Sequence, residues 1–331
     1  MNLIELFIEK AKKEKKRIVL PEGNDERILQ AARIILDKGI ARPIILGDEN
    51  EIKALAQKIN LNLSGLEILK PDTSPLLNEF ASIYAKEKEN MTEGIARKLI
   101  HKSLFFGCMM VAEDKADGLV GGISHATASL LQAAGLAIGY PKDVHTPSSF
   151  FIMVLPEFSG EKNKILIFAD CAVNINPDSR QLAEIAVTTG RTVRELLNME
   201  PRIALLSFST KGSASHEDVD KVIKATEIAR VMAPELIIDG ELQADAALIP
   251  RVAQKKVKAS EVAGKANVLI FPDLDSGNIA YKLTQYLAGA QAFGPILQGF
   301  KKPICDLSRG ASPNDVVGIT AIVAVQAQGS K

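Results

Sequence analysis

The sequence predicts an α/β protein with a largely parallel sheet that is covered by helices. Short runs rich in β-branched residues alternate with longer segments whose apolar residues recur at helical spacing. Glycine, proline or a capping residue separates most of these segments, so strands and helices follow one another along nearly the whole chain. Because a parallel pair of strands is joined by a crossover helix, this alternation favours helices on the faces of the sheet.

The first elements illustrate the pattern. Residues 17–20 form a short β-branched strand, and Asn24 or Asp25 then caps a helix with apolar residues at helical spacing. Gly39 ends that helix, and residues 43–47 form the next strand. Further strands are expected at 118–121, 165–168, 203–208, 236–239 and 268–271, and further helices at about 178–197, 216–232, 242–256 and 276–288.

Two breaks in this pattern mark candidate domain boundaries. Residues 139–143 interrupt a helix with glycine and proline, and residues 299–303 precede the last strand and helix. We therefore expect one domain of residues 1–141 plus 303–331 and a second domain of residues 142–302. The C-terminal segment would then return to the first domain.

Composition excludes several classes of partner. Lys plus Arg and Asp plus Glu each number 40, so the formal net charge is zero, whereas nucleic acid or an anionic membrane requires a sustained basic field. Cys108, Cys171 and Cys305 have no C-x-x-C spacing, which indicates buried thiols rather than a disulfide framework or a zinc site. Neither a signal peptide nor a membrane-spanning run is recognisable, so we expect a cytoplasmic protein.

The last segment carries the strongest candidate site. Residues 306–315 contain Ser308 and Arg309 and lead into an apolar stretch that is expected to form a buried helix. Ser312 fits the N-cap of that helix and Asp315 its third position. Free amides, the helix dipole and a guanidinium would together bind an anion there. From spacing alone, a capping carboxylate is the better explanation of Asp315, and a surface ion-pairing residue is the better explanation of Arg309.

Three further polar clusters follow predicted strands, where ligands bind in open α/β sheets. Residues 207–213 offer hydroxyls, an amine and glycine amides, but they also fit a helix-capping turn. In residues 121–129, His125 is either a ligand or acid, or a capping or packing histidine. Asp273 and Asp275 could hold a metal, but they fit a helix N-terminus better, so no metal site is predicted.

One set of motifs is spread along nearly the whole chain. It begins with Pro21-Glu22-Gly23-x-Asp25-x-Arg27 and closes with Asp306-Leu307-Ser308-Arg309-Gly310. Between them, in order, lie motifs at residues 209–214, 239–247, 264–268, 271–282 and 294–299. Taken together, these segments resemble the phosphate acetyltransferase family.

The resemblance implies both a fold and a reaction. The fold would be two three-layer α/β/α domains with a cleft between them, related to the isocitrate and isopropylmalate dehydrogenases, in a homodimer. The enzyme would interconvert acetyl-CoA and phosphate with acetyl phosphate and coenzyme A by direct thiolate attack. Coenzyme A would be a substrate, no cofactor would be tightly bound, and neither nucleic acid nor a membrane would be a partner.

The resemblance also implies roles for particular residues. Carried over position by position, Asp315 would be the base, Ser308 the partner of the carbonyl oxygen and Arg309 the phosphate ligand. A thiol has a pKa of about 8.5 and an aspartic acid about 3.9, so a complete proton transfer would cost about 6 kcal/mol, which favours transfer concerted with attack. The predicted substrate-binding residues are His125, Thr127, Ser129, Ser209, Lys211, Asn278, Tyr281 and Lys282.

The chain departs from the family at three positions. Lys86, Gln132 and Tyr286 stand where the family usually has arginines associated with coenzyme A and phosphate. A lysine cannot reproduce the planar fork of a guanidinium. These departures leave open a non-catalytic acyl-CoA sensor of the same fold. A phosphate propanoyl- or butanoyltransferase also stays open, because one or two methylenes in the acyl group leave no clear mark in the sequence. A metal-dependent dehydrogenase of the related fold would need a carboxylate cluster, of which only Asp273 and Asp275 give a hint.

Overall fold

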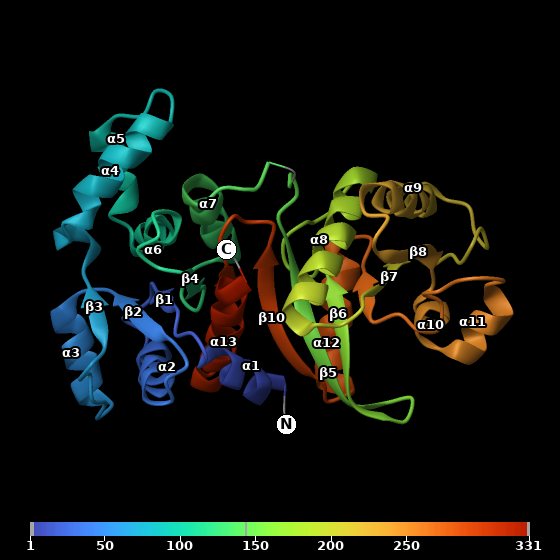
Figure 1. Cartoon of the computed structure of the whole chain (residues 1–331), viewed down its shortest axis with the longest axis horizontal. Helices are drawn as coiled ribbons and strands as arrows, with labels where there is room; N and C mark the ends of the chain where they lie inside the picture. Colours follow the sequence, from blue (N-terminus) through green and yellow to red (C-terminus); the bar gives the residue numbers. More distant parts are fainter. Residues whose placement is uncertain (1–2, 143, 330–331) are drawn as a thin grey trace. The chain divides into compact units, whose positions relative to one another are not determined.

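The chain forms two compact units. The computed structural model describes residues 3–142 and 144–329, and it divides into Met1–Tyr140 with Phe300–Lys331 as unit 1 and Pro141–Gly299 as unit 2 (Figure 1). The C-terminal segment thus belongs to unit 1. Asp143, which is part of the predicted hinge, lies outside the described residues. That the two units fold as independent domains stays a prediction.

Unit 1 contains a parallel sheet with one reversal of strand order. Each strand pairs in parallel with its neighbours in the order β3-β2-β1-β4-β11. The chain moves outward in one direction from β1 and later continues on the other side of it with β4. Such a reversal places a crevice at the carboxyl ends of the central strands, where ligands bind in open sheets. The strands are β1 (Arg17–Leu20), β2 (Arg42–Leu46), β3 (Glu67–Leu69), β4 (Gly118–Gly121) and β11 (Ile304–Asp306).

Helices cover both faces of this sheet. On one face α13 packs against β1, β4 and β11 and also against α1 and α2, while α6 and α7 cover the other face (Figure 1). The predicted apolar C-terminal helix is α13, and it is buried from Val316 to Ala324 as its composition required. The helices of unit 1 are α1 (Leu3–Ala11), α2 (Glu26–Asp37), α3 (Glu49–Lys58), α4 (Leu76–Glu87), α5 (Glu93–Ile100), α6 (Ser103–Ala112), α7 (Thr127–Ala137) and α13 (Pro313–Gly329), with a 3₁₀ turn η1 (Pro71–Thr73).

Unit 2 contains a mixed sheet in the order β10-β5-β6-β9-β7-β8. The strand β5 is antiparallel to both β10 and β6, whereas β6, β9, β7 and β8 pair in parallel. The sequence pattern did not predict the β5–β6 hairpin, because most of β5 is buried and its apolar run lacks the alternation of a half-buried strand. The strands are β5 (Ser148–Phe158), β6 (Glu161–Ala169), β7 (Arg202–Leu206), β8 (Ile237–Leu242), β9 (Val268–Ile270) and β10 (Gln291–Gln298).

Unit 2 also has three layers. The helices α8 (Ser179–Leu197) and α9 (Glu217–Met232) pack together against β7, while α10 (Ala244–Leu248), α11 (Pro250–Lys256) and α12 (Leu274–Leu287) belong to the other layer. The single helix predicted at 242–256 was wrong. It is interrupted at Ile249, because Pro250 lacks an N–H and begins a new helix instead. Among the described residues, none of the helices has both the length and the apolar character needed to cross a lipid bilayer.

Candidate active site

Three loops of unit 1 meet at one edge of its sheet. They follow β1, β4 and β11, which are neighbours and run in parallel, so their carboxyl ends lie side by side. The loops comprise residues 21–25, 122–126 and 307–312. Motifs from the beginning, the middle and the end of the chain are therefore brought together at the place where open α/β sheets bind ligands.

The carboxylate of Glu22 links the loop after β1 to the loop after β4 by hydrogen bonds. It is buried and accepts hydrogen bonds from four successive backbone N–H groups, at distances of 2.7–3.0 Å. The donors are Gly122, Ile123, Ser124 and His125. Such a ring of amides satisfies a buried charge, which would otherwise be costly. The turn after β1 therefore determines the shape of the loop after β4.

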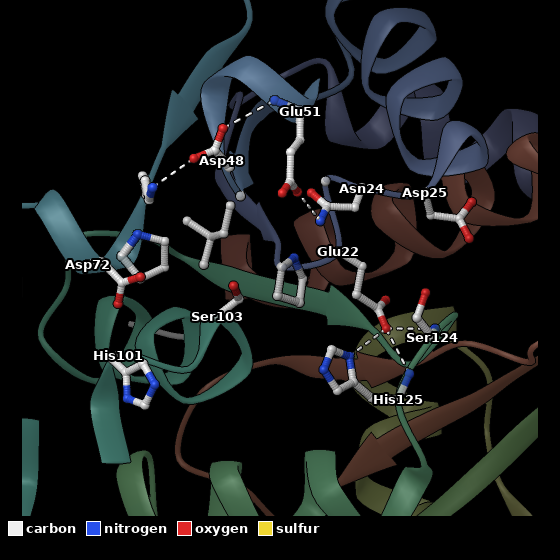
Figure 2. Close-up of a pocket in the computed structure, with 16 residues that line it drawn as sticks. Glu22, Asn24, Asp25, Asp48, Glu51, Asp72, His101, Ser103, Ser124 and His125 are labelled. Carbon is white, nitrogen blue, oxygen red and sulfur yellow. Dashed lines mark hydrogen bonds and ion pairs between the residues drawn. The ribbon is translucent and has the colours of Figure 1, made fainter. Parts of the chain in front are cut away.

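His125 is a positioned side chain rather than a packing histidine. Its Nδ1 lies 2.8 Å from Oε1 of Glu22, and its ring is 41% exposed (Figure 2). Because an ionised carboxylate only accepts hydrogen bonds, Nδ1 carries the proton and Nε2 is the nitrogen left for another partner. Glu22 thus sets both the tautomer and the orientation of His125.

A second link joins the start of α7 to β11. The hydroxyl of Thr127 donates to Oδ2 of Asp306 at 2.5 Å, and Oδ1 of the same carboxylate is buried without a hydrogen-bond partner. Burial raises the pKa of Asp306 to about 6, although the bond from Thr127 acts in the opposite direction. Gly122, with a φ of +109°, is required here, because a Cβ would lie 1.9 Å from Oδ1 of Asp306.

The loop between β11 and α13 presents the predicted catalytic residues. The side chains of Ser308, Arg309 and Asp315 are all exposed. Ser312 donates its N–H and its hydroxyl to Oδ2 of Asp315 at 2.8 and 2.7 Å, and its hydroxyl accepts from the N–H of Asp315 at 3.3 Å. This is a capping box, so the capping role predicted for Asp315 is present. Both bonds to the carboxylate use Oδ2, which leaves Oδ1 for another partner.

The hydroxyl of Ser308 is also available. Its Oγ accepts a hydrogen bond from the N–H of Gly310 at 3.3 Å, so the hydroxyl hydrogen can still be donated. Ser129, which was predicted to bind substrate, is exposed in the first turn of α7. Neither Ser308 nor Ser129 uses its hydroxyl as a donor in a hydrogen bond within the part of the chain that the structure describes.

The predicted residues after β7 in unit 2 are engaged internally. Ser209 is fully buried, donates to Oε1 of Glu241 at 3.0 Å and accepts from the N–H of Ala214 at 3.1 Å. Lys211 donates from Nζ to Oδ1 of Asp239 at 2.5 Å. Burial alone would raise the pKa of Asp239, but hydrogen bonds such as that from Lys211 hold it below its ordinary value. The substrate-binding role of these two residues stays a prediction.

The predicted residues on α12 are partly engaged. Asn278 donates from its amide to the carbonyl oxygen of Cys171 at 3.0 Å. Tyr281 stacks on Phe151 with ring centroids 4.1 Å apart, and Nζ of Lys282 lies 5.0 Å from the centroid of the Tyr281 ring. Their roles also stay predictions.

Asp273 is the N-cap of α12, where it accepts from the N–H of Ser276 at 2.8 Å. This confirms the capping role that the sequence favoured. Within residues 3–142 and 144–329, no three His, Cys, Asp or Glu side chains are grouped as a metal ion would require.

A polar cavity of about 520 Å³ lies beside Glu22 and His125 in unit 1 (Figure 2). The sequence interpretation missed most of the residues that line it. Several of them follow β2 and β3 closely, and they could have been found from the rule that open α/β sheets bind ligands at the carboxyl ends of their strands. Inside it, Lys70 pairs with Asp48 at 2.7 Å, and Nδ1 of His101 lies 2.6 Å from the carbonyl oxygen of Lys98. The missed residues are Asn24, Asp48, Glu51, Lys70, Asp72, His101 and Ser103.

Comparison with known proteins identifies the chain as an acyl-transferring enzyme. The chain belongs to the phosphate acetyl/butaryl transferase family, whose sequence profile matches residues 2–324. It is 51% identical to a phosphate acetyltransferase of Thermoanaerobacterium thermosaccharolyticum over 330 residues. This alignment covers 99% of this chain and 100% of that protein. A crystal structure of a phosphotransacetylase from Streptococcus pyogenes superposes with a TM-score of 0.93 at 41% identity and covers 100% of both chains. The family resemblance inferred from the motifs is therefore confirmed.

A weaker likeness extends to a dehydrogenase. A 4-hydroxythreonine-4-phosphate dehydrogenase from Klebsiella pneumoniae superposes with a TM-score of 0.57 at 11% identity, over 95% of this chain and 100% of that one. At this identity the likeness concerns the fold alone. It agrees with the predicted relation to dehydrogenase folds, although the enzyme is not one of the two dehydrogenases that the resemblance named.

Proposed function

We propose that the chain transfers an acetyl group between coenzyme A and phosphate, interconverting acetyl-CoA and phosphate with acetyl phosphate and coenzyme A. The observation that carries this proposal is the loop between β11 and α13. There an exposed hydroxyl (Ser308), an exposed guanidinium (Arg309) and a carboxylate with one uncommitted oxygen (Asp315) stand at the N-terminus of a buried helix. Backbone amides and a positive dipole end favour an anion such as phosphate there.

The reaction needs these three kinds of group. The thiol of coenzyme A attacks the carbonyl carbon of acetyl phosphate, the new bond to sulfur forms, and the bond to the phosphate oxygen breaks. Asp315 accepts the thiol proton, Ser308 donates a hydrogen bond to the developing oxyanion, and Arg309 binds the departing phosphate through two donors. No covalent acyl-enzyme is needed, because the thiol itself is the acceptor.

The capping box limits how Asp315 can act. Ser312 donates two hydrogen bonds to Oδ2 of its carboxylate, so Oδ1 is the oxygen left to accept the thiol proton. The ordinary pKa of a thiol lies far above that of an aspartic acid. A transfer that is concerted with attack on the carbonyl carbon is therefore favoured over a stable pair of thiolate and carboxylic acid.

We also propose that the enzyme is a homodimer that uses the exposed face of α12. Four apolar side chains recur there at positions i, i+4, i+7 and i+8, and they are between 52% and 81% exposed. They are Ile279, Leu283, Tyr286 and Leu287. A row of this kind on a helix marks an interaction surface.

Size-exclusion chromatography with light scattering tests the dimer. It should show a dimer for the wild-type chain, and Leu283→Glu should shift it toward monomer. A monomeric wild-type chain would contradict the proposal.

A thiol-release assay tests the activity. Purified chain is mixed with acetyl-, propanoyl- or butanoyl-CoA in the presence of phosphate or arsenate, and free thiol is measured, with an anion-free mixture as the control. We expect anion-dependent release that is fastest with acetyl-CoA. Faster release from butanoyl-CoA would assign the longer acyl group. Binding of acetyl-CoA without any anion-dependent release would instead support the non-catalytic sensor.

Arg309→Lys tests the phosphate contact. Lysine keeps the charge but lacks the fork of donors, so the KM for phosphate should rise, while the melting temperature stays near that of the wild type. An unchanged KM at an unchanged turnover would remove Arg309 from the site.

A further inference from the structure

Arg27, at the beginning of α2, is tied to the loop that carries Ser308 and Arg309. Its Nη1 donates to the carbonyl oxygen of Arg309 at 2.7 Å and to that of Ala311 at 3.2 Å. Its Nε and Nη2 donate to the two carboxylate oxygens of Asp25 at 2.9 and 2.7 Å. Asp25 is itself the N-cap of α2, so a rigid helix end orients the guanidinium.

These bonds fall at the middle of a loop whose two ends are held by other contacts. At one end, the buried Asp306 is bonded to Thr127, and at the other end the capping box joins Ser312 to Asp315. Between these points, two backbone carbonyl groups next to the predicted catalytic side chains accept from Arg27. The guanidinium therefore determines where the backbone that bears Ser308 and Arg309 lies.

We propose that Arg27 is a positioning residue for acyl transfer. It holds the 308–311 loop so that the hydroxyl of Ser308 and the guanidinium of Arg309 are directed at the reacting groups. The proposal rests on the function proposed above for this loop. Misplacement of a catalytic group by about 1 Å can cost as much as 100-fold in rate, so a contact that sets the loop backbone has a measurable consequence.

The geometry argues against a direct contact between Arg27 and a substrate phosphate. A guanidinium has five N–H donors, and the hydrogen bonds to Asp25, Arg309 and Ala311 already engage four of them. Its charge is compensated as well, since the hydrogen bond from Arg27 lowers the pKa of Asp25. One remaining donor beside a carboxylate makes a poor anion site.

The same helix supplies a matched control. Arg33 donates from Nε and Nη2 to the carboxylate of Asp37, and its Nη1 donates to the carbonyl oxygens of Asn62 and Ser64 at 3.3 and 2.7 Å. Arg33 thus repeats the arrangement of Arg27, with one carboxylate and two loop carbonyls, but its loop carries none of the predicted site residues. The two arginines differ in which loop they hold.

The test compares Arg27→Gln with Arg33→Gln. For each variant, kcat, the KM for phosphate, coenzyme A affinity and melting temperature are measured on one preparation. We expect Arg27→Gln to lower kcat/KM for phosphate by about 10- to 100-fold, and Arg33→Gln to stay within about 2-fold of the wild type at a comparable loss of melting temperature. Arg27→Lys, which can still donate to one carbonyl and is the safer variant for folding, should fall between Arg27→Gln and the wild type. Equal kinetics for the Arg27 and Arg33 variants would overturn the proposal.

A double-mutant cycle with Asp25→Asn separates positioning from binding. Asparagine preserves the N-cap but no longer orients the guanidinium by charge. If Arg27 positions the loop, Asp25→Asn lowers kcat/KM in the same direction, and the double variant is no worse than Arg27→Gln. If Arg27 instead bound phosphate directly, Asp25→Asn would strengthen phosphate binding, and that result would overturn the proposal. A wild-type chain without phosphate-dependent thiol release would refute the proposed function itself, independently of these comparisons.

Discussion

The polar loops of unit 1 and of unit 2 follow the same sequence rule but use their side chains differently. Both lie after parallel strands and are rich in hydroxyls, glycine and a cation. In unit 1, Ser308 and Arg309 are exposed, and backbone groups of their loop accept the positioning contacts. In unit 2, Ser209 is fully buried against Glu241, and Lys211 is paired with Asp239.

The difference shows what makes a polar loop available for chemistry. Where a side chain from another segment donates hydrogen bonds to the loop backbone, as Arg27 does, the polar side chains of the loop remain available to a substrate. Where buried carboxylates such as Glu241 need partners, the hydroxyl and the amine of the loop satisfy them instead.

The largest effect is expected for Asp315→Asn in unit 1. If Asp315 is the general base, turnover should fall by about 10²–10⁴-fold while coenzyme A still binds, because asparagine keeps the shape but accepts no proton. If it only completes the capping box, the cost is about 0.5–1 kcal/mol of stability and little rate. Turnover and melting temperature are measured together, and a near-normal rate with a lowered melting temperature would leave His125 as the candidate base.

Ser308→Ala should have the next largest effect. Removing one oxyanion donor costs about 10²–10³-fold in turnover in other enzymes. The exposed hydroxyl of Ser308 donates no hydrogen bond to any other described residue, so alanine breaks none that it donates. Because the residue does not ionise near neutral pH, the pH dependence of turnover should keep its shape. A normal rate would show that the carbonyl oxygen finds its partner elsewhere.

Lys211→Met tests whether the polar loop of unit 2 has a structural role. We expect a loss of about 1 kcal/mol in the free energy of unfolding, and turnover within about 3-fold of the wild type. The loss is small because Arg230 still donates to Asp239 at 2.6 Å. Urea denaturation and steady-state kinetics measure the two effects. A large rise in the KM for coenzyme A at unchanged stability would restore Lys211 to its predicted role in substrate binding.

Asp306 makes the stability of the folded chain depend on pH. Its folded pKa of about 6 lies above the ordinary value of 3.8, so the folded state holds the proton more tightly than the unfolded state does. Its contribution is therefore fully present below about pH 4 and is lost as the pH rises through about 6, by at most about 3 kcal/mol. Asp306→Asn should flatten the free energy of unfolding between about pH 4 and pH 7 relative to the wild type. An identical slope in both proteins would mean that Asp306 titrates normally.

Features that depend on near neighbours in the chain could be predicted from the sequence. Strands and helices were predicted because the period of apolar residues is a local property. The caps at Asp25, Asp273 and Ser312 were predicted because each joins groups two or three residues apart. The choice of Ser308, Arg309 and Asp315 as catalytic residues came from the family motif, and their roles await the variants described above.

Which polar groups meet across the chain depends on the tertiary fold. Glu22 and the amides of 122–125, Thr127 and Asp306, and Arg27 and the carbonyl of Arg309 are about 100 to 282 residues apart. No local pattern encodes such pairs, because they depend on β1, β4 and β11 becoming neighbours in one sheet. For the same reason the sequence could not tell that Ser209 faces Glu241 whereas Ser308 faces solvent. Residue type and spacing indicate what a side chain can do, and the partner that folding brings to it decides whether it remains available to do so.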